Sequence, residues 1–508
     1  MRFVYLCNVL LLAAAAFGQT TCSKPRVRRA WSHYSAEEKA LYIDAVALSM
    51  KNGYHQRFVE IHMEPTSERE AHGCLFFYWH RAFLFAYENM LRSLDSKYAC
   101  ITIPFWDYAT IGSKFQAGSC KNMLDCGPLL KDFGGSLPRG RRALSQSVNG
   151  AGFQSDNCVS SAMTKYFCQS TSAFTSKSCY NCMPRNDWSK VSVPPDVNVL
   201  NIFNNILGAS QPTLSSVTSG VQYGTHNMVH AVLDSVMGTF ASPSDPVFYS
   251  HHVKQVQENF KINTIATVDA MHAIYYKCIV GADSLKADNS KVWSSCRNYI
   301  GKTIVPGDII AMKVGETGTR TQSIWTATSS PIYKFFKDLK QTYPDYADIS
   351  KLGYSYDFSD TALDGMYTNC KKFKPSKSLF LEEMDEKKHH KHHKAKKAKK
   401  EEGSVEKDCL SKEFDWIDEA TTLASKYYTD PSDVYNQVHI MTCVYYNECR
   451  GGVYDYSDEF KENFRVEHGP PCKRVIDDLA RGDCAIGVPN WEKIMLKHYQ
   501  CDSPSEDF

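Results

Sequence analysis

The chain has 508 residues, of which 43% are hydrophobic and 22% are charged, and its formal net charge is +2 at pH 7. A chain of this length can bury a full core and can form more than one domain. Because positive and negative charges nearly cancel, the overall charge points neither to nucleic acid nor to a membrane surface as a partner.

The N-terminus is typical of a secretory signal peptide over residues 1–18. Arg2 supplies the positive charge, residues 4–17 are apolar apart from two positions, and small residues at 16 and 18 precede Gln19. A membrane anchor is the alternative, but the apolar stretch is short for a span. We therefore expect a secreted protein.

The cysteines favour a disulfide framework. There are 19 in the sequence, and 18 remain once Cys7 leaves with the signal peptide. An even number in a secreted chain argues for disulfides rather than free thiols. Twelve of them lie within residues 22–370 and six within 409–501, which suits two separately cross-linked domains. The pair Cys179 and Cys182 has zinc-ligand spacing, but no second pair accompanies it, so disulfides are favoured here too.

Residues 19–360 are predicted to form one large, mainly helical domain. Ser35 is a suitable N-cap, and acidic residues follow it in the first turn of the first expected helix. Residues 110–190 are rich in Gly, Ser and Cys and are predicted to be long loops tied by disulfides. We expect helices over residues 36–50 and 76–94, within 217–238, and from 246 towards 260.

The composition changes over residues 361–408. The run from Lys387 to Lys400 contains only Lys, His and Ala, and such a segment cannot bury enough apolar surface to fold. An exposed linker is therefore predicted. Helical patterns return over 414–428 and 434–446, which indicates a small helical, Cys-rich C-terminal domain over 409–508.

Seven histidines outside the linker fall into two groups. His226 and His230 are four apart, so a helix would place both rings on one face, where they can share a metal ion. Two unrelated buried histidines are the alternative. A zinc protease would place Glu, its general base, directly after the first of them. Asn227 stands there instead, which argues against a hydrolase. The first group is His62, His72 and His80, and the second is His226, His230, His251 and His252.

The adjacent pair in the second group follows Asp245-Pro246, a helix-start signature. Neighbouring helical residues point about 100° apart, so only one of His251 and His252 can share a focal point with the other two. Sites made of imidazoles alone suit copper, zinc, iron or nickel. Two such sites in one domain favour copper.

These segments resemble, in order and spacing, the two copper motifs of the tyrosinase family, which includes catechol oxidases and molluscan-type haemocyanins. The resemblance extends over residues 25–360, and the segments that carry it are Phe58–His62, His72–Gly73, Phe77–Arg81, Tyr87–Glu88, Pro104–Asp107, His226–His230 and Asp245–His252. It implies a four-helix-bundle core that holds two copper ions in a type 3 centre. The implied ligands are His62, His72 and His80 for the first copper, and His226, His230 and His252 for the second.

The resemblance also implies roles around the metals. His251 would lie beside the second copper without binding it, Phe248 would orient the His230 ring, and Thr239 would lie at the substrate entrance. Residues 354–356 resemble the tyrosine motif that closes the catalytic domain. One of Arg26, Arg28 and Arg29 is expected to stack on that motif, and a solvated basic stretch or processing site is the alternative.

The chain departs from the family pattern at several positions. Val256 stands where members often have Asp, and Gln222 and Tyr223 stand where many have an acid that, with Asn227, helps to deprotonate monophenols. These departures favour catechol oxidation over monophenol hydroxylation. A Cys–His thioether, known in many members, would need Cys74, for which a disulfide is favoured.

The implied function is a secreted oxidoreductase that uses O2 to convert o-diphenols to o-quinones, as in melanin formation, and the resemblance also implies ortho-hydroxylation of monophenols as a second activity. An O2 carrier of the haemocyanin type is one alternative, and a catechol oxidase without monophenolase activity is another. In many family members a C-terminal extension covers the site until it is cleaved, and the Lys-rich linker would be a suitable cleavage site. Its four histidines, at 389, 390, 392 and 393, can bind copper, although a solvated tail is favoured.

Overall fold

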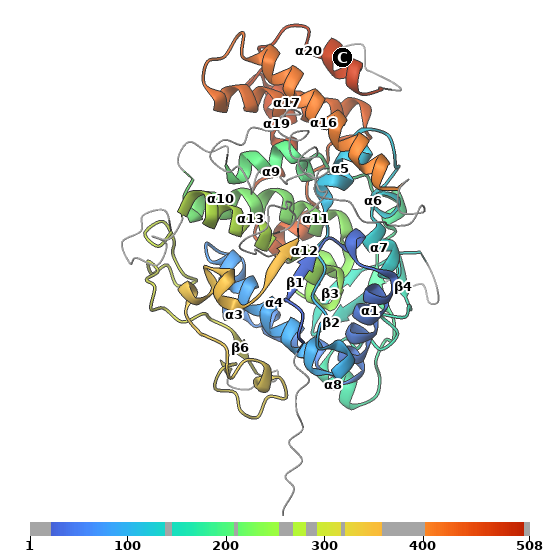
Figure 1. The fold of residues 1–508 in the computed structure, drawn as a ribbon, viewed down its shortest axis with the longest axis vertical. Coiled ribbons are helices and arrows are strands. Elements are labelled where there is room, and N and C mark those ends of the chain that lie inside the picture. Colours follow the sequence, from blue (N-terminus) through green and yellow to red (C-terminus); the bar gives the residue numbers. More distant parts are fainter. Residues whose placement is uncertain are drawn as a thin grey trace, which may run out of the picture.

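The computed structural model describes most of the chain, and that part is mainly helical, as predicted (Figure 1). The expected signal peptide, nearly all of the expected linker, and Val256 lie outside the described residues. The described residues are 22–137, 145–207, 212–252, 268–280, 292–315, 321–357 and 402–501.

Local signals account for the first helices. Ser35 caps the first helix in a capping box, in which its side chain accepts from the Glu38 backbone N–H and the Glu38 carboxylate accepts from the Ser35 N–H. The aromatic helix α4 contains neither Gly nor Pro and is buried on nearly every side. These helices are α1 (Ala36–Lys51), α2 (His55–Met63), α3 (Pro65–Ala71) and α4 (Phe76–Ser93).

A second set of helices completes the core around α4. Asp245 caps the short helix α12 by accepting from the Val247 backbone N–H at 3.0 Å, as the Asp-Pro signature predicted. The segment before the second histidine group contains a π-helical turn, η5, which leads directly into α11. These elements are α5 (Tyr108–Gln116), α9 (Val199–Ile206), α10 (Leu214–Val221), η5 (Gln222–His226), α11 (Asn227–Leu233), α12 (Val247–His252) and α13 (Val268–Tyr275).

Short helices and turns occupy the loop regions. They are η1 (Trp31–His33), η2 (Ser96–Tyr98), α6 (Met123–Cys126), α7 (Pro128–Asp132), α8 (Thr171–Thr175), η3 (Trp188–Lys190), η4 (Pro195–Val197), η6 (Ser235–Gly238), η7 (Ser242–Ser244), η8 (Tyr276–Val280), η10 (Tyr333–Phe335), η11 (Tyr343–Tyr346) and η12 (Ile349–Leu352).

The described strands form only two-stranded sheets. The parallel pair β1·β8 joins the two ends of the large domain and places the Arg28 guanidinium 4.3 Å from the centre of the Tyr354 ring. The expected stacking of an arginine on the tyrosine motif is thus confirmed. The strands are β1 (Val27–Arg29), β2 (Ser145–Val148), β3 (Ala151–Gln154), β4 (Asn157–Val159), β5 (Met183–Arg185), β6 (Lys313–Val314), β7 (Gln322–Ser323) and β8 (Ser355–Asp357).

Disulfides cross-link the loops, as the cysteine count predicted. Cys179 and Cys182 belong to two different disulfides, which confirms disulfides over zinc for this pair. The expectation that no thiol stays free is wrong, because Cys409 and Cys484 are unpaired. The disulfides are Cys22–Cys100, Cys74–Cys296, Cys120–Cys126, Cys158–Cys182, Cys168–Cys179, Cys443–Cys472 and Cys449–Cys501, and Cys278 is also disulfide-bonded.

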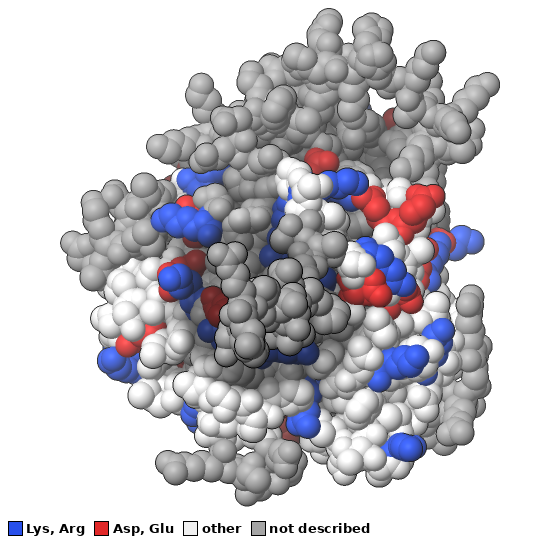
Figure 2. Space-filling model, turned by 60° about the horizontal axis from the view of Figure 1, so that its bottom comes forward, with Lys and Arg blue, Asp and Glu red and all other residues white. Residues whose placement is uncertain are grey.

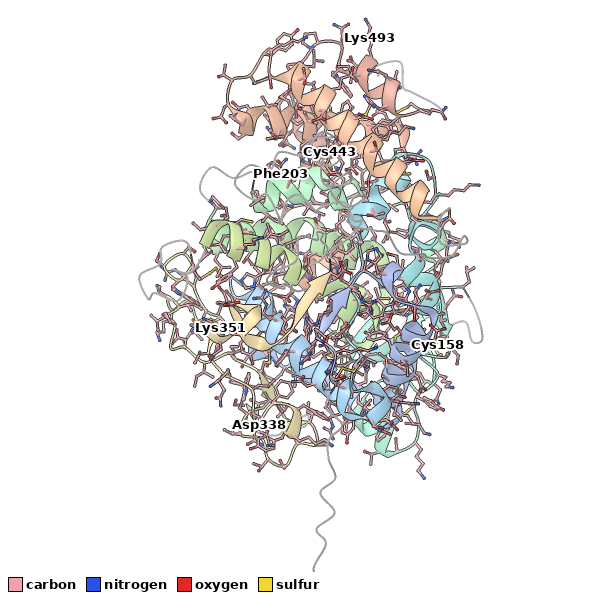
Figure 3. The ribbon with its side chains drawn as sticks, in the orientation of Figure 1. Cys158, Phe203, Asp338, Lys351, Cys443 and Lys493 are labelled. Carbon is pink, nitrogen blue, oxygen red and sulfur yellow. A yellow bond between two sulfur atoms is a disulfide. The ribbon has the colours of Figure 1, made fainter. Side chains whose placement is uncertain are left out.

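Of the five helices near the C-terminus, α16, α17, α19 and α20 pack together at one end of the large domain, at the top of Figure 1. Apolar side chains of α16, α17 and α20 extend the main core, because α16 packs on α5 and α17 packs on α9, whereas those of α18 belong to a separate small cluster. Phe203 of α9 contacts the Tyr435 ring of α17 at 5.1 Å between ring centroids, and Figure 3 labels Phe203 and Cys443 on these two helices. We call this set the C-terminal helices: α16 (Glu402–Ala424), α17 (Pro431–Cys449), α18 (Asp458–Phe464), α19 (Pro471–Arg481) and α20 (Trp491–His498).

The described surface shows no large area of one charge sign on the face in Figure 2, where acidic and basic side chains lie interspersed. This agrees with the small net charge. Within the part of the chain that the structure describes, no helix combines the length and apolar character that a membrane crossing requires.

A buried carboxyl joins the C-terminal helices to the large domain. Glu413 of α16 accepts from the Ser113 hydroxyl of α5 and, at 3.1 Å, from the Val199 backbone N–H of α9. Burial raises the pKa of Glu413 from 4.5 to about 7. The folded protein therefore retains a proton that the unfolded chain releases, so this contribution to stability is full below pH 4.5 and is lost as the pH rises through 7.

We expect Glu413→Gln to remove that pH dependence. The variant should match the wild type near pH 5 and exceed its free energy of unfolding at pH 8 by up to roughly 3 kcal/mol. Thermal unfolding followed by circular dichroism across this pH range measures the difference. The exposed Glu462→Gln serves as the matched control, and equal pH profiles for wild type and Glu413→Gln would contradict the assignment.

A buried ion pair holds the start of α12. Both Arg185 and Asp245 are almost fully buried, and Arg185 donates to the carboxylate at 2.6 and 2.8 Å and to two backbone carbonyls of the 133–135 turn. Removing one partner would leave the other charge buried and unpaired. We expect Arg185→Leu to lower the free energy of unfolding by roughly 3–5 kcal/mol.

Denaturant unfolding of the variant measures this loss. The exposed pair Lys97–Asp44 supplies the control, since water screens this pair and Lys97→Gln should change the free energy of unfolding far less than Arg185→Leu does. Similar losses for the two variants would show that burial does not distinguish these pairs.

Candidate metal centre

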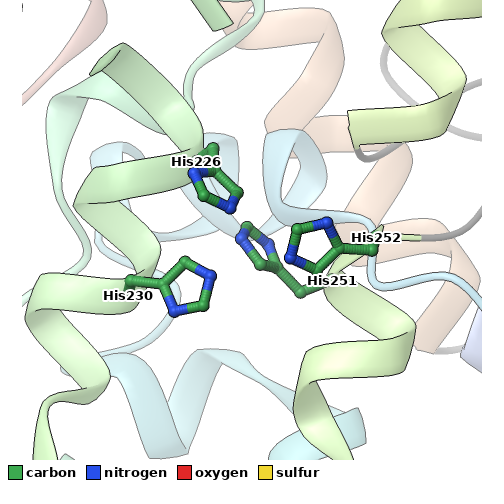
Figure 4. Close-up of side chains that lie close together, drawn as sticks. All are labelled: His226, His230, His251 and His252. Atoms are coloured by element: carbon green, nitrogen blue, oxygen red, sulfur yellow. The ribbon is translucent and has the colours of Figure 1, made fainter. Parts of the chain in front are cut away.

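The second histidine group converges from two directions (Figure 4). His226 ends η5 and His230 lies one turn further along α11, with ring centroids 4.5 Å apart. His251 and His252 come from the end of α12. One ring nitrogen from each of the four residues lies within 4.8 Å of the others, and all four side chains are buried.

The first histidine group is drawn from three consecutive helices. His62 lies near the end of α2, His72 follows the last residue of α3, and His80 lies in the first half of α4. Their ring centroids are separated by 5.1 Å, 5.7 Å and 6.1 Å. The rings of this group are further apart than most ring pairs of the second group.

The two groups face each other. The rings of His80 and His252 stack with centroids 4.2 Å apart and an interplanar angle of 9°. Phe248 lies between the groups, 4.2 Å from His252, 5.2 Å from His62 and 6.1 Å from His230. Phe248 therefore contacts both groups, and its contact with the His230 ring is the longest of the three.

Each of the six rings other than His252 is held through Nδ1. A hydrogen bond donated from Nδ1 fixes the ring orientation and leaves the Nε2 lone pair for a metal ion. The acceptors are backbone carbonyls for four rings: Phe240 for His62 (2.8 Å), Glu68 for His72 (3.0 Å), Phe76 for His80 (2.9 Å) and Met237 for His230 (2.7 Å). Nδ1 of His226 bonds the Asn227 side-chain oxygen (2.8 Å), and Nδ1 of His251 bonds the Tyr108 hydroxyl (2.9 Å).

The free nitrogens fit a metal centre. Nε2 of His62, His80, His226 and His251, and both nitrogens of His252, are buried without a hydrogen-bond partner among the described residues. A buried polar atom without a partner is costly unless something else binds it. Burial also lowers the pKa of all these rings well below the usual value, and lowers that of His230 to about 3, so the imidazoles are neutral and able to bind a metal.

The adjacent pair differs in its surroundings. His251 is anchored by Tyr108 and stacks on His226 at 5.0 Å, whereas His252 has no anchor and lies between His80 and Phe248. Both rings belong to the cluster. The choice of His252 as the ligand stays a prediction.

The residues that were expected near the substrate, Gln222, Asn227 and Thr239, each form a side-chain hydrogen bond within the protein. Gln222 donates from its amide to the His72 carbonyl at 3.0 Å, and Asn227 holds His226. No carboxylate is hydrogen-bonded to Asn227 among the residues that the structure describes. The Thr239 hydroxyl is buried and donates to the Val236 carbonyl at 3.0 Å. Cys74 is joined to Cys296, which confirms the favoured disulfide and leaves no sulfur for a thioether.

Two aromatic side chains that the sequence analysis missed cover the histidines. Phe240 lies 4.9 Å from the His72 ring. Phe464, at the end of α18, lies 5.7 Å from His72, 5.3 Å from His230 and 5.3 Å from Phe240. The pair Phe460 and Phe464, four apart in α18, was a sequence signal for an apolar face, but nothing in it indicated where that face would dock.

An ion pair lies directly beside Phe464. Arg465 donates to both oxygens of the Glu68 carboxylate at 2.8 and 2.9 Å, and its guanidinium lies 5.3 Å from the Phe240 ring centre. Glu68 belongs to α3 and is almost fully buried one turn before His72. The C-terminal helices thus contact the histidine groups through both an aromatic ring and a charge.

A third cluster contains residue types that can bind metals, but two of its members are joined in a disulfide. His439, Cys443 and Cys472 are buried close together in the C-terminal helices. Because the two cysteines form a disulfide, they offer no thiolate ligands.

Part of the chain is similar in sequence to known proteins. Residues 52–256 match the family model described as the common central domain of tyrosinase. The chain is 27% identical over 243 residues to a tyrosinase of Streptomyces galbus, covering 44% of this chain and 79% of that protein. It is 28% identical over 250 residues to a tyrosinase of Streptomyces antibioticus, covering 44% and 78%. A solved polyphenol oxidase of Thermothelomyces thermophila is similar over 66% of this chain and 90% of that one, with 16% identity and a TM-score of 0.39.

Proposed function

The chain belongs to the tyrosinase family of type 3 copper proteins, and from this premise we propose that it holds two copper ions and oxidises o-diphenols to o-quinones with O2. The observation that carries the proposal is the two facing groups of buried neutral imidazoles, most of them with Nδ1 held and Nε2 free. Such donors suit copper.

Under this proposal His62, His72 and His80 hold the first copper, and His226, His230 and His252 hold the second. Copper, when bound, supplies the binding of O2 and the transfer of electrons. The chain's own residues orient the imidazoles through Nδ1 and exclude water with the aromatic side chains around them.

The place of the phenol is suggested by Phe464. Its ring meets His72 edge-to-face and lies tilted against His230 and Phe240, and a substrate ring could contact the same side chains once Phe464 is displaced. We therefore propose that the C-terminal helices act as a lid that keeps the uncleaved protein latent. The bidentate Arg465–Glu68 ion pair would help to hold the lid.

The linker before the C-terminal helices would be the place of activation. The Lys-rich run over 387–400 is a suitable protease target. We also propose that the protein is secreted, on the strength of the N-terminal signal pattern and of the many disulfides.

The environment of Asn227 favours diphenols over monophenols. The Asn227 side-chain oxygen is occupied by His226, its amide nitrogen is buried without a partner among the described residues, and position 222 carries a neutral amide. A monophenol must lose its proton before hydroxylation, and no carboxylate is bonded to Asn227 in the described part of the chain to help. We propose that catechol oxidation is the main activity.

The direct test measures copper content and O2 uptake on a catechol and on a monophenol, before and after proteolysis of the linker. We expect two coppers per chain, little turnover before cleavage, and faster turnover of the catechol than of the monophenol after it. Reversible O2 binding without turnover, even after cleavage, would instead indicate a carrier. Zinc in place of copper would contradict the proposal.

A further inference from the structure

Two neighbouring residues at the end of α18 contact the site with different chemistry. Phe464, the last residue of α18, places its ring centre 5.7 Å from that of His72 and 5.3 Å from that of His230. Arg465, which follows it as the C-cap, donates to both oxygens of the Glu68 carboxylate at 2.8 and 2.9 Å. The C-terminal helices therefore present an aromatic ring and a cation together beside the histidine groups.

Phe240 of the large domain shows that the ring and the cation meet one surface. The centre of its ring lies 5.3 Å from the centre of the Phe464 ring and 5.3 Å from the guanidinium carbon of Arg465. Phe240 also packs on the His72 ring at 4.9 Å between centroids. A small molecule that carries an aromatic ring and a cation on a short chain would meet the same surface once the lid is displaced.

The Glu68 carboxylate becomes accessible when the lid leaves. Its side chain is 3% exposed, whereas the side chain of Arg465 that covers it is 56% exposed, so the guanidinium lies between the carboxylate and the solvent. Among the described residues, Arg465 is the one Lys or Arg side chain that pairs with Glu68. A carboxylate that loses a close cationic partner is stabilised by binding another cation in its place.

We propose that Glu68 selects catechols that carry an ammonium group on a short side chain, and that Phe464 and Arg465 occupy the places of the substrate ring and cation in the latent protein. The ammonium group would donate to the Glu68 oxygens and lie against the Phe240 ring. A neutral catechol gains nothing from the carboxylate, and a catechol with a carboxylate side chain is repelled by it. The inference rests on the proposed function, because it takes the position of the Phe464 ring as that of the phenol.

A positioning role behind the metal is the alternative for Glu68. One of its carboxylate oxygens lies 3.4 Å from Nδ1 of His72, so a substitution also changes the surroundings of a proposed copper ligand. A change of that kind affects every catechol by the same factor. Recognition of charge instead changes the ratio between catechols, so this ratio distinguishes the two roles.

The test measures O2 uptake by the copper-loaded protein after linker cleavage, with three catechols that differ in side-chain charge: dopamine, 4-ethylcatechol and 3,4-dihydroxyphenylacetate. We expect kcat/KM to be highest for dopamine and lowest for the carboxylate. Glu68→Gln keeps the size of the side chain and should lower the preference for dopamine over 4-ethylcatechol about tenfold, mainly through KM. The control Asp338→Asn removes the same charge from a side chain that is 79% exposed and should keep the wild-type ratio.

Binding of compounds that cannot be oxidised gives a second measurement, which does not depend on turnover. Phenethylamine and 2-phenylethanol share the same ring and chain length and differ in the charge of the terminal group. In isothermal titration calorimetry with the cleaved protein, the wild type should bind phenethylamine about tenfold more tightly than 2-phenylethanol. Glu68→Gln should bind the two compounds alike.

The proposal is overturned if the wild type shows no preference for the ammonium compounds, or if Glu68→Gln keeps that preference while it slows all three catechols by the same factor. Failure of the phenol oxidase proposal is recognised separately. In that case none of the three catechols is oxidised, while the binding preference for phenethylamine can still be measured.

Discussion

His230→Ala should bring the bound copper from two towards one per chain and abolish catechol oxidation. The His230 ring is held by a hydrogen bond to the Met237 carbonyl. One of its ring nitrogens lies within 4.8 Å of a ring nitrogen of each of three other histidines. Losing a supporting group behind a metal ligand already costs about 10–100-fold in affinity or activity. Removing the imidazole itself should lower catechol oxidation by at least about a hundredfold, measured as O2 uptake after linker cleavage, with copper counted by mass spectrometry.

His439→Ala is the matched control for that experiment. His439 is also a buried histidine beside other possible ligands, but its cysteine neighbours form a disulfide in the C-terminal helices. The control should retain both coppers and most of its activity. Two coppers and near-normal turnover in His230→Ala would remove this residue from the copper site.

Phe464→Ala should activate the uncleaved protein. The Phe464 ring contacts His72, His230 and Phe240 at 5.3–5.7 Å between centroids, and truncating a buried Phe to Ala typically costs 3–5 kcal/mol of packing. Even partial loss of that packing shifts the lid towards the open state. We expect catechol oxidation by the full-length chain to rise about tenfold or more.

Phe460→Ala provides the comparison within the same helix. Phe460 stacks on Phe464 at 4.3 Å and belongs to the same small apolar cluster, but no contact joins it to a described histidine of the site. Its truncation should activate the chain less. Equal activation by both variants would show that lid packing matters and that the position of the Phe464 ring does not.

Linker cleavage adds a further check. If Phe464 acts only by covering the site, wild type and Phe464→Ala should reach the same catechol oxidation rate once the C-terminal helices are released. A persistent difference after cleavage would mean that Phe464 influences the site in another way.

The local sequence pattern was enough to predict elements that depend on residues close together in the chain. Ser35 and Glu38 are three apart, so the capping box of α1 could be predicted, as could the aromatic helix α4. The four-residue spacing of His226 and His230 likewise predicted two rings on one face. The identity of the chemistry also came from sequence, because two groups of imidazoles without a carboxylate or thiolate suit few metals.

Contacts between distant segments could not be predicted in this way. The acceptors that hold His62 and His230 are backbone carbonyls, which every residue possesses, so sequence cannot distinguish Phe240 or Met237 from their neighbours. Disulfide connectivity could not be predicted for the same reason. An even number of cysteines indicates that disulfides form but not which cysteines pair, and even this indication was wrong for Cys409 and Cys484, which are unpaired.

The sequence by itself therefore determined the helical class, the histidine groups and the metal they suit. Only the tertiary structure decided which face of α18 meets the site. The contacts that place this helix, Arg465 with Glu68 and Phe464 with His72, join residues that are almost four hundred positions apart in the sequence. Helix periodicity specifies an apolar face, but the surface that covers it depends on the packing of the whole chain. The docking of Phe464 over His72 and His230 is a property of the fold.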